Sequence, residues 1–231
     1  MIRPLAYIVV NAIRFFRLVE FYQPTCNPKG YKLLGQDNPK RLSEDRLQQI
    51  LGAIDLSSVH SYLDIGSQLG FYVFRFSEVR SELKAHGMEK DTVAHTYAQA
   101  LKSLNRAANV FFVNRKITIA SARSLPSYDL ITFMNVFHHI VHFDGFEAAD
   151  GIMRELYMKC NKCFVFETGQ FDEKGYYWSD NLSFMGDHPI GWIQDYLLKI
   201  GYDTVALIGF NGTHLSDQKR GLFLCTKRQT V

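Results

Sequence analysis

Short apolar runs alternate with amphipathic stretches along the chain from residue 60 onward. The apolar runs have the length of buried strands, and the stretches between them have helical spacing. Strands that alternate with helices in this way predict a parallel sheet covered on both faces. We expect strands over 61–65, 86–89, 110–113, 128–135 and 163–167, and two more over 203–210 and 221–226.

Helix start and stop signals lie before the first of these strands and between the later ones. Ser43, Glu44 and Asp45 form a capped, acidic first turn, which is typical of a helix N-terminus. Gly66 and Gly70 open another helix directly after the first strand, and Pro189 precedes a further one. We expect helices over about 43–53, 70–84, 92–104, 146–158 and 189–201.

The first 40 residues differ from the rest. Their apolar run is interrupted by Asn11, Arg14 and Arg17, so it is shorter than the roughly 20 residues of a membrane span. No signal-peptide cleavage pattern follows it. We expect residues 1–40 to form an amphipathic helix and a turn-rich linker, and residues 41–231 to form the main domain. The helix could lie on a membrane surface, aided by Arg3, Arg14 and Arg17, or pack on the domain or a second subunit. Its apolar stripe is Leu5, Ile8, Ala12, Phe16 and Val19.

Composition restricts the function classes. A chain of 231 residues has the length of one domain with additions. Its 26 lysines and arginines against 23 acidic residues give a net charge of +3, too balanced to predict nucleic acid as a partner. Four cysteines make no disulfide framework, and Cys160-x-x-Cys163 lacks the further ligands of a zinc site. We therefore expect a cytoplasmic protein without a metal, with membrane association through the first helix as an option.

The most informative motif lies where the first strand meets the next helix. Asp64, Gly66 and Gly70 form a tight turn whose backbone N–H groups could approach a ligand. The spacing is not the G-x-G-x-x-G of dinucleotide-binding proteins. About twenty residues later Glu89 ends the second strand, where an acidic side chain can accept hydrogen bonds from both hydroxyls of a ribose.

Together with Asn135-Val136-Phe137-His138-His139, this pattern resembles the class I S-adenosylmethionine-dependent methyltransferases over residues 40–228. The resemblance implies a Rossmann-like α/β fold, with a seven-stranded, mostly parallel sheet whose last strand is antiparallel. It implies S-adenosylmethionine as the cofactor. Gln68 departs from the family, which usually has glycine there. The resemblance assigns cofactor contacts to Tyr22, Gln23, Arg41, Asp64, Gly66, Gly70, Glu89, Ser121, Ala122 and Asn135.

A narrower set of residues resembles the methyltransferase half of the bacterial O-antigen chain-terminating phosphate methyltransferase/kinase enzymes. The set comprises the segments 136–142 and 213–216, the pair Tyr177-Trp178, and Arg220. The resemblance implies that His138, His139 and Arg220 serve catalysis. It implies that the acceptor is bound by His142, Tyr177, Trp178 and His214.

Two mechanisms stay open at this point. A neutral histidine could take a proton from a hydroxyl acceptor. A phosphate acceptor needs no base and would be bound by cations such as Arg220. A metal on His-His-x-x-His is not expected, because no carboxylate partner is evident.

The expected function is methyl transfer to an oxygen atom of a small-molecule or saccharide acceptor, with the phosphate of a sugar or polysaccharide end as the specific candidate. Methylation of RNA or of another small molecule is an alternative. A catalytically silent binding protein with this fold is another.

Overall fold

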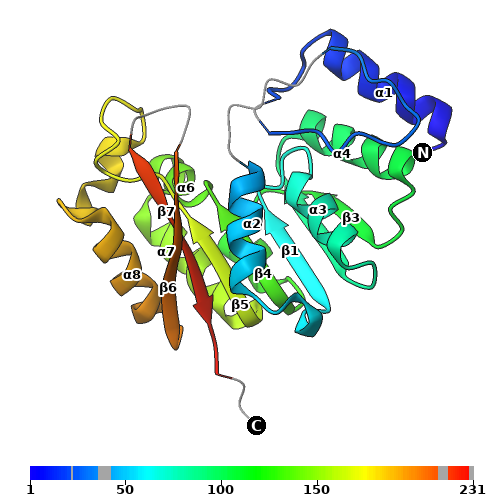
Figure 1. The fold of residues 1–231 in the computed structure, drawn as a ribbon. Coiled ribbons are helices and arrows are strands. Elements are labelled where there is room, and N and C mark those ends of the chain that lie inside the picture. The colour runs from blue at the N-terminus through cyan, green and yellow to red at the C-terminus, as the bar shows by residue number, and fades with distance from the viewer. Residues whose placement is uncertain (22, 36–42, 213–217, 229–231) are drawn as a thin grey trace.

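The computed structural model describes residues 1–21, 23–35, 43–212 and 218–228. Within them seven strands form one twisted sheet in the order β3-β2-β1-β4-β5-β7-β6 (Figure 1). The first five strands are parallel, and β7 runs antiparallel between β5 and β6. The predicted Rossmann-like α/β sheet with an antiparallel last strand is confirmed. The strands are β1 (Ser61–Ile65), β2 (Lys84–Glu89), β3 (Val110–Asn114), β4 (Tyr128–Met134), β5 (Cys160–Glu167), β6 (Thr204–Gly212) and β7 (Lys219–Thr226).

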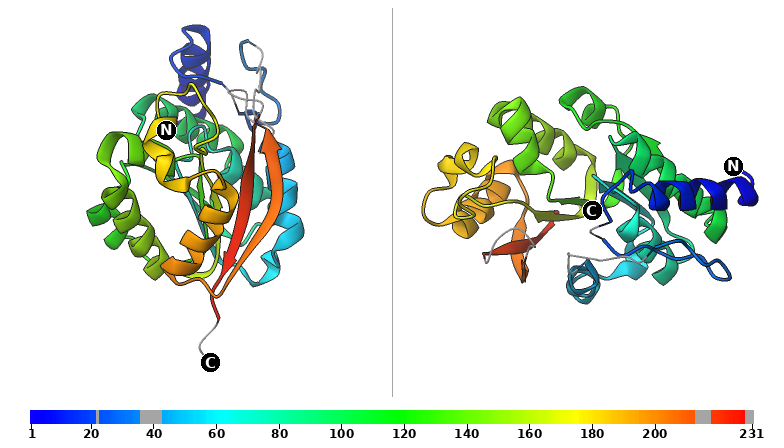
Figure 2. Two further views of the ribbon diagram at one scale, coloured as in Figure 1. Left: turned by 90° about the vertical axis from the view of Figure 1, so that its left-hand side faces the viewer. Right: turned by 90° about the horizontal axis from the view of Figure 1, so that it is seen from above.

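Helices cover both faces of this sheet, and two views at right angles to Figure 1 show the layers (Figure 2). Side chains of α2, α3 and α4 form one apolar core with the sheet, and those of α6, α7 and α8 form the other. The helices are α1 (Arg3–Phe15), α2 (Ser43–Ala53), α3 (Phe71–Val79), α4 (Thr92–Asn105), α5 (Ile119–Arg123), α6 (Phe137–Asp144), α7 (Phe146–Lys159) and α8 (Pro189–Ile200), with 3-10 turns η1 (Leu56–Ser58) and η2 (Ser179–Met185).

Strand β1 illustrates why apolar runs in the sequence predicted the strands. Successive side chains of a strand point to opposite faces, so Tyr62 enters the core beneath α3 while Leu63 enters the core on the other face. Both side chains are buried. A strand with two buried faces is mostly apolar, and β1 departs from this only at Ser61 and at the buried Asp64.

Two boundaries differ from expectation by three or more residues. The helix after the glycine turn ends at Val79 instead of about residue 84, because β2 already begins at Lys84. Strand β5 begins at Cys160 instead of residue 163, so the C-x-x-C pair lies within a strand as free thiols. Helix α6 was not predicted. Among the described residues no group of three or more histidines, cysteines or carboxylates could hold a metal ion.

The predicted N-terminal helix exists as α1. The side that packs against the domain is the one opposite to the predicted apolar stripe. Ala6, Val10 and Ile13 are buried against the core that includes α4, whereas Leu5 and Ile8 of the predicted stripe face solvent. Both sides of the helix are apolar, so the pattern alone did not distinguish them. No described helix has the length and apolar character that crossing a bilayer requires.

Candidate functional site

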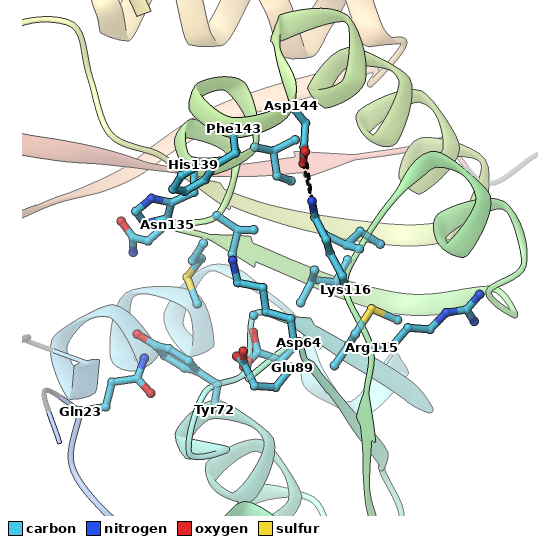
Figure 3. A pocket seen from close by; sticks show the side chains of 18 of the residues that line it. Gln23, Asp64, Tyr72, Glu89, Arg115, Lys116, Asn135, His139, Phe143 and Asp144 are labelled. Carbon is cyan, nitrogen blue, oxygen red and sulfur yellow. Dashed lines mark hydrogen bonds and ion pairs between the residues drawn. The ribbon is translucent and has the colours of Figure 1, made fainter. Parts of the chain in front are cut away.

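A cavity of about 380 Å³ lies over the carboxyl ends of β1, β2, β3 and β4 (Figure 3). Ligands of open α/β sheets bind at this edge because the ends of neighbouring parallel strands meet there. The volume falls within the range of small-molecule sites. Side chains labelled in Figure 3 are Gln23, Asp64, Tyr72, Glu89, Arg115, Lys116, Asn135, His139, Phe143 and Asp144.

One glycine of the turn, Gly66, lies on the lining of this cavity. Gly66 has a φ of +77°, and a Cβ atom there would lie 2.5 Å from Val136 Cγ2, so a side chain does not fit. Its N–H donates to the carbonyl of Met88 at 2.8 Å. Gly70 is the N-cap of α3 and lies outside the cavity lining. Of the two predicted glycines, the structure therefore brings only Gly66 to the cavity.

Gln68 occupies the position where the resembled family has glycine. Its φ is +49°, a left-handed conformation that glycine adopts without steric cost. The side chain compensates by donating from Nε2 to the carbonyl of Glu20 at 2.6 Å. The departure from the family pattern thus ties the glycine turn to the segment that follows α1.

Two buried carboxylates stand beside the turn. Glu89 accepts from the backbone N–H of Gln68 at 2.9 Å and from that of Asp91 at 2.8 Å, which leaves further lone pairs on both oxygens. Asp64 accepts from the Thr132 hydroxyl at 2.7 Å. Burial, reinforced by the negative charge of Glu89, raises the pKa of Asp64 to about 7. Neither carboxylate forms an ion pair with a described residue, so the site is suited to a cationic ligand.

The remaining walls come from distant segments. Gln23 is buried and lines the cavity, and its Oε1 atom has no hydrogen-bond partner among the described residues. Arg115 and Lys116 line the wall after β3, and Lys116 Nζ lies 2.8 Å from Asp144 Oδ2 at the end of α6. The predicted contacts after β3, Ser121 and Ala122, lie elsewhere. The Ser121 hydroxyl completes a capping box at the start of α5, and Ala122 is in the core.

Asn135 turns the chain from β4 into α6 with a φ of +61°. Its Nδ2 donates to Glu167 Oε1 at 2.7 Å, and its Oδ1 accepts from Arg220 Nη1 at 2.5 Å. Glu167, at the end of β5, also accepts from Arg46 Nε at 2.9 Å. Asn135 and Arg46 both line the cavity. This wall is therefore held in one position by a buried, hydrogen-bonded charge network.

Arg220 itself does not line the cavity, contrary to the role expected for it. Its side chain is 1% exposed and forms a forked pair with Glu173. Its guanidinium carbon also lies 5.3 Å from the ring centroid of Trp178, which is fully buried. This burial argues against direct contact of either Arg220 or Trp178 with an acceptor. Both residues support the wall from behind.

The three histidines of α6 have separate environments. His138 is buried, and its Nδ1 accepts from the backbone N–H of Gly169 at 2.9 Å, so the ring proton lies on Nε2. His139 lines the cavity, and its Nδ1 is 2.9 Å from the hydroxyl of Tyr177. His142 lies outside the lining and contacts Asn181 Oδ1 at 2.7 Å. The exposed ring of Tyr177 packs between His139 and His142. Only His139 of the three borders the cavity.

Several lining residues were not predicted. Arg115 and Lys116 directly follow the third strand, where contacts were sought five residues too late. Arg46 lies on a helix that was predicted, but nothing in its local pattern indicated a cavity. Three predicted site residues, Tyr22, Arg41 and His214, lie outside the part of the chain that the structure describes. The lining residues that the prediction missed include Arg46, Tyr72, Lys90, Arg115, Lys116 and Phe143.

These observations fit S-adenosylmethionine. The Gly66 turn lies on the cavity lining, Glu89 can accept hydrogen bonds from ribose hydroxyls, and the Gln23 Oε1 atom is available for a donor. The buried pair Asp64 and Glu89 would be relieved by a positively charged ligand, and the cofactor carries both an ammonium and a sulfonium group.

Strand order, the antiparallel β7 and a cavity at the carboxyl edge define the fold of the class I S-adenosylmethionine-dependent methyltransferases. Comparison with solved structures supports this assignment of the fold. The bifunctional kinase-methyltransferase WbdD superposes with a TM-score of 0.72 at 21% identity, covering 96% of this chain and 47% of that one. This chain therefore spans about half the length of WbdD.

Two further structures have the same fold. Magnesium protoporphyrin IX methyltransferase (ChlM) from Synechocystis PCC 6803, solved with bound S-adenosylmethionine, gives a TM-score of 0.61 at 13% identity over 98% of this chain and 97% of that one. An O-methyltransferase family protein from Burkholderia thailandensis gives a TM-score of 0.58 at 14% identity, covering 82% of this chain and 57% of that one. No protein-family model matches the chain, and no curated protein matches it either.

Proposed function

We propose that this chain binds S-adenosylmethionine in the cavity and transfers its methyl group to an oxygen atom of a small-molecule or saccharide acceptor. The observation that carries this proposal is the placement of Gly66 and Glu89 together at the carboxyl edge of a sheet with methyltransferase topology. The cofactor, when bound, supplies a methyl group on a positively charged sulfur.

The chain's own residues would position the cofactor and activate the acceptor. The Glu89 carboxylate, which two backbone N–H groups hold in place, would accept hydrogen bonds from the ribose hydroxyls. Asp64 would carry a negative charge beside the cofactor's cationic end. His139 is the histidine that lines the cavity, and its neutral imidazole would take the proton of a hydroxyl acceptor. Holding donor and acceptor in line can contribute several kcal/mol to the rate.

A phosphate acceptor is the second candidate. Lys90 and Arg115 place two cations on the cavity lining, and segment 136–142 resembles enzymes that methylate a phosphate. A phosphate oxygen is already anionic, so His139 would then bind the acceptor instead of removing a proton. Arg220, paired with Glu173, would support the wall through Asn135 in either case.

Titration calorimetry with S-adenosylhomocysteine tests cofactor binding directly. The Glu89→Ala variant should lose two charge-assisted hydrogen bonds, and its affinity should fall at least about tenfold. Glu82→Ala, which removes the same charge from an exposed site, is the matched control and should bind normally. Equal affinity in the two variants would refute the ribose assignment. Normal binding without transfer of labelled methyl to any saccharide, phosphate or RNA acceptor would favour a silent binding protein.

A further inference from the structure

Helix α1 has two apolar sides, and the domain covers only one of them. Ala6, Val10 and Ile13 are buried against the neighbouring core. Figure 1 shows α1 at the outer edge of the molecule, beyond α4. The uncovered side and the helix ends carry Ile2, Leu5, Ile8, Phe15 and Phe16, which are between 48% and 72% exposed. We call these five residues the outer face of α1.

The outer face contains no charged residue, although three arginines lie close in sequence. Arg14 points inward and donates to the Tyr97 hydroxyl at 3.0 Å and to the carbonyl of Gly35. Arg3 lies over the ring of Tyr31. Soluble monomers rarely expose a contiguous apolar surface of this kind, and such a surface marks an interaction site.

Charge is distributed unevenly along the chain. Residues 1–35 contain five of the 26 lysines and arginines but only one of the 23 acidic residues. This segment therefore carries +4, and the remaining 196 residues carry −1. Arg17, Lys29 and Lys32 are exposed members of it. The whole positive excess of the chain lies in the segment that bears the outer face.

An uncovered apolar helix face combined with local positive charge fits one occupant. An anionic bilayer accepts apolar side chains at its acyl boundary and attracts nearby lysines and arginines. A second copy of the chain would instead bring two +4 segments together. We propose that α1 binds the surface of an anionic phospholipid bilayer, with its outer face inserted and Arg17, which directly follows Phe16, near the head groups. The helix would lie parallel to the surface, since it is too short to span it.

Vesicle co-sedimentation of the full chain tests this proposal. The chain should sediment with vesicles of equal parts phosphatidylcholine and phosphatidylglycerol, and much less with phosphatidylcholine alone. Phe16→Glu should weaken binding at least about tenfold, because one inserted aromatic side chain is lost. Arg17→Gln should weaken it about fivefold. Met158→Glu on α7 is the control: Met158 is as exposed as Phe16, and its substitution should leave binding unchanged.

Circular dichroism should show the same helix content in all variants, because the substituted side chains are exposed. Failure of the wild-type chain to bind anionic vesicles, or equal binding by Phe16→Glu and Met158→Glu, would overturn the proposal. A dimer in sedimentation velocity that Phe16→Glu dissociates, without vesicle binding, would overturn it in favour of contact between two copies. The proposal does not depend on methyltransferase activity.

Discussion

Glu173 holds Arg220 by two parallel hydrogen bonds, each 2.8 Å between nitrogen and carboxylate oxygen, with both side chains buried. A third nitrogen of the guanidinium donates to Asn135 Oδ1. The arginine thus transmits the position of one buried carboxylate to a residue that lines the cavity. Its charge is compensated inside the protein and is not presented to an acceptor.

Removing one partner of this pair should strongly destabilise the folded protein. Arg220→Met would leave the Glu173 carboxylate buried without its forked partner, and the free energy of unfolding should fall by about 3–5 kcal/mol. Urea unfolding measures this. The double variant Arg220→Met/Glu173→Leu should lose at least about 1 kcal/mol less than the sum of the two single variants.

The exposed pair Arg123–Glu155 is the matched control. Its nitrogen–oxygen distance is 2.7 Å, close to that of the buried pair, but Arg123 is 70% exposed. Arg123→Met should cost no more than about 1 kcal/mol. Equal losses for Arg220→Met and Arg123→Met would show that burial does not make the Arg220 pair important.

The left-handed backbone of Gln68 predicts an unusual order of stabilities. Alanine at φ +49° keeps the steric cost of a side chain and loses the hydrogen bond to Glu20, whereas glycine loses only the bond. Gln68→Gly should therefore be more stable than Gln68→Ala by about 1 kcal/mol. At Gln48, an exposed position inside α2, the order should reverse, because glycine is the poorer helix former. Urea midpoints of the four variants decide this.

The raised pKa of Asp64 predicts a pH dependence of stability. The folded protein holds this proton up to about pH 7, whereas the unfolded chain releases it near pH 4. Raising the pH through this window therefore favours unfolding, by up to about 4 kcal/mol, and the slope vanishes above the folded pKa. Asp64→Asn should lack this contribution, so the difference between the two unfolding curves isolates it. A difference that stays constant from pH 4 to pH 7 would contradict the raised pKa.

Most of the sheet was predictable because its burial is local in sequence. The run over 128–135 became β4, a central strand whose residues are almost all buried. The run over 110–113 became β3, an edge strand on which Phe111 and Val113 are exposed. The strand order was not predicted, and the antiparallel last strand was expected only through the family resemblance. The packed side of α1 was predicted wrongly, because both of its sides are apolar and the choice depends on contact with α4.

The cavity was less predictable than the fold. Gly66 and Glu89 were found because turn geometry and strand ends leave a local signal. The pairing of Arg220 with Glu173 joins residues 47 positions apart, and no local pattern records it. Trp178 was assigned to the acceptor through the family resemblance, but the residue is buried behind the wall.

His139 and His138 should respond differently to substitution, although they are neighbours. His139 lines the cavity, so with a hydroxyl acceptor His139→Gln should lower kcat by about 10²–10⁴-fold. The wild-type rate should also fall toward acid pH, because a protonated imidazole cannot act as a base. His138→Asn keeps an acceptor for the Gly169 N–H and should retain most turnover while losing stability. With a phosphate acceptor both the acid limb and the large effect at His139 should be absent. Rates of labelled methyl transfer across pH 5.5–8.5 separate the two acceptors, and loss of turnover in His138→Asn alone, with His139→Gln unaffected, would reverse the roles assigned to these two rings.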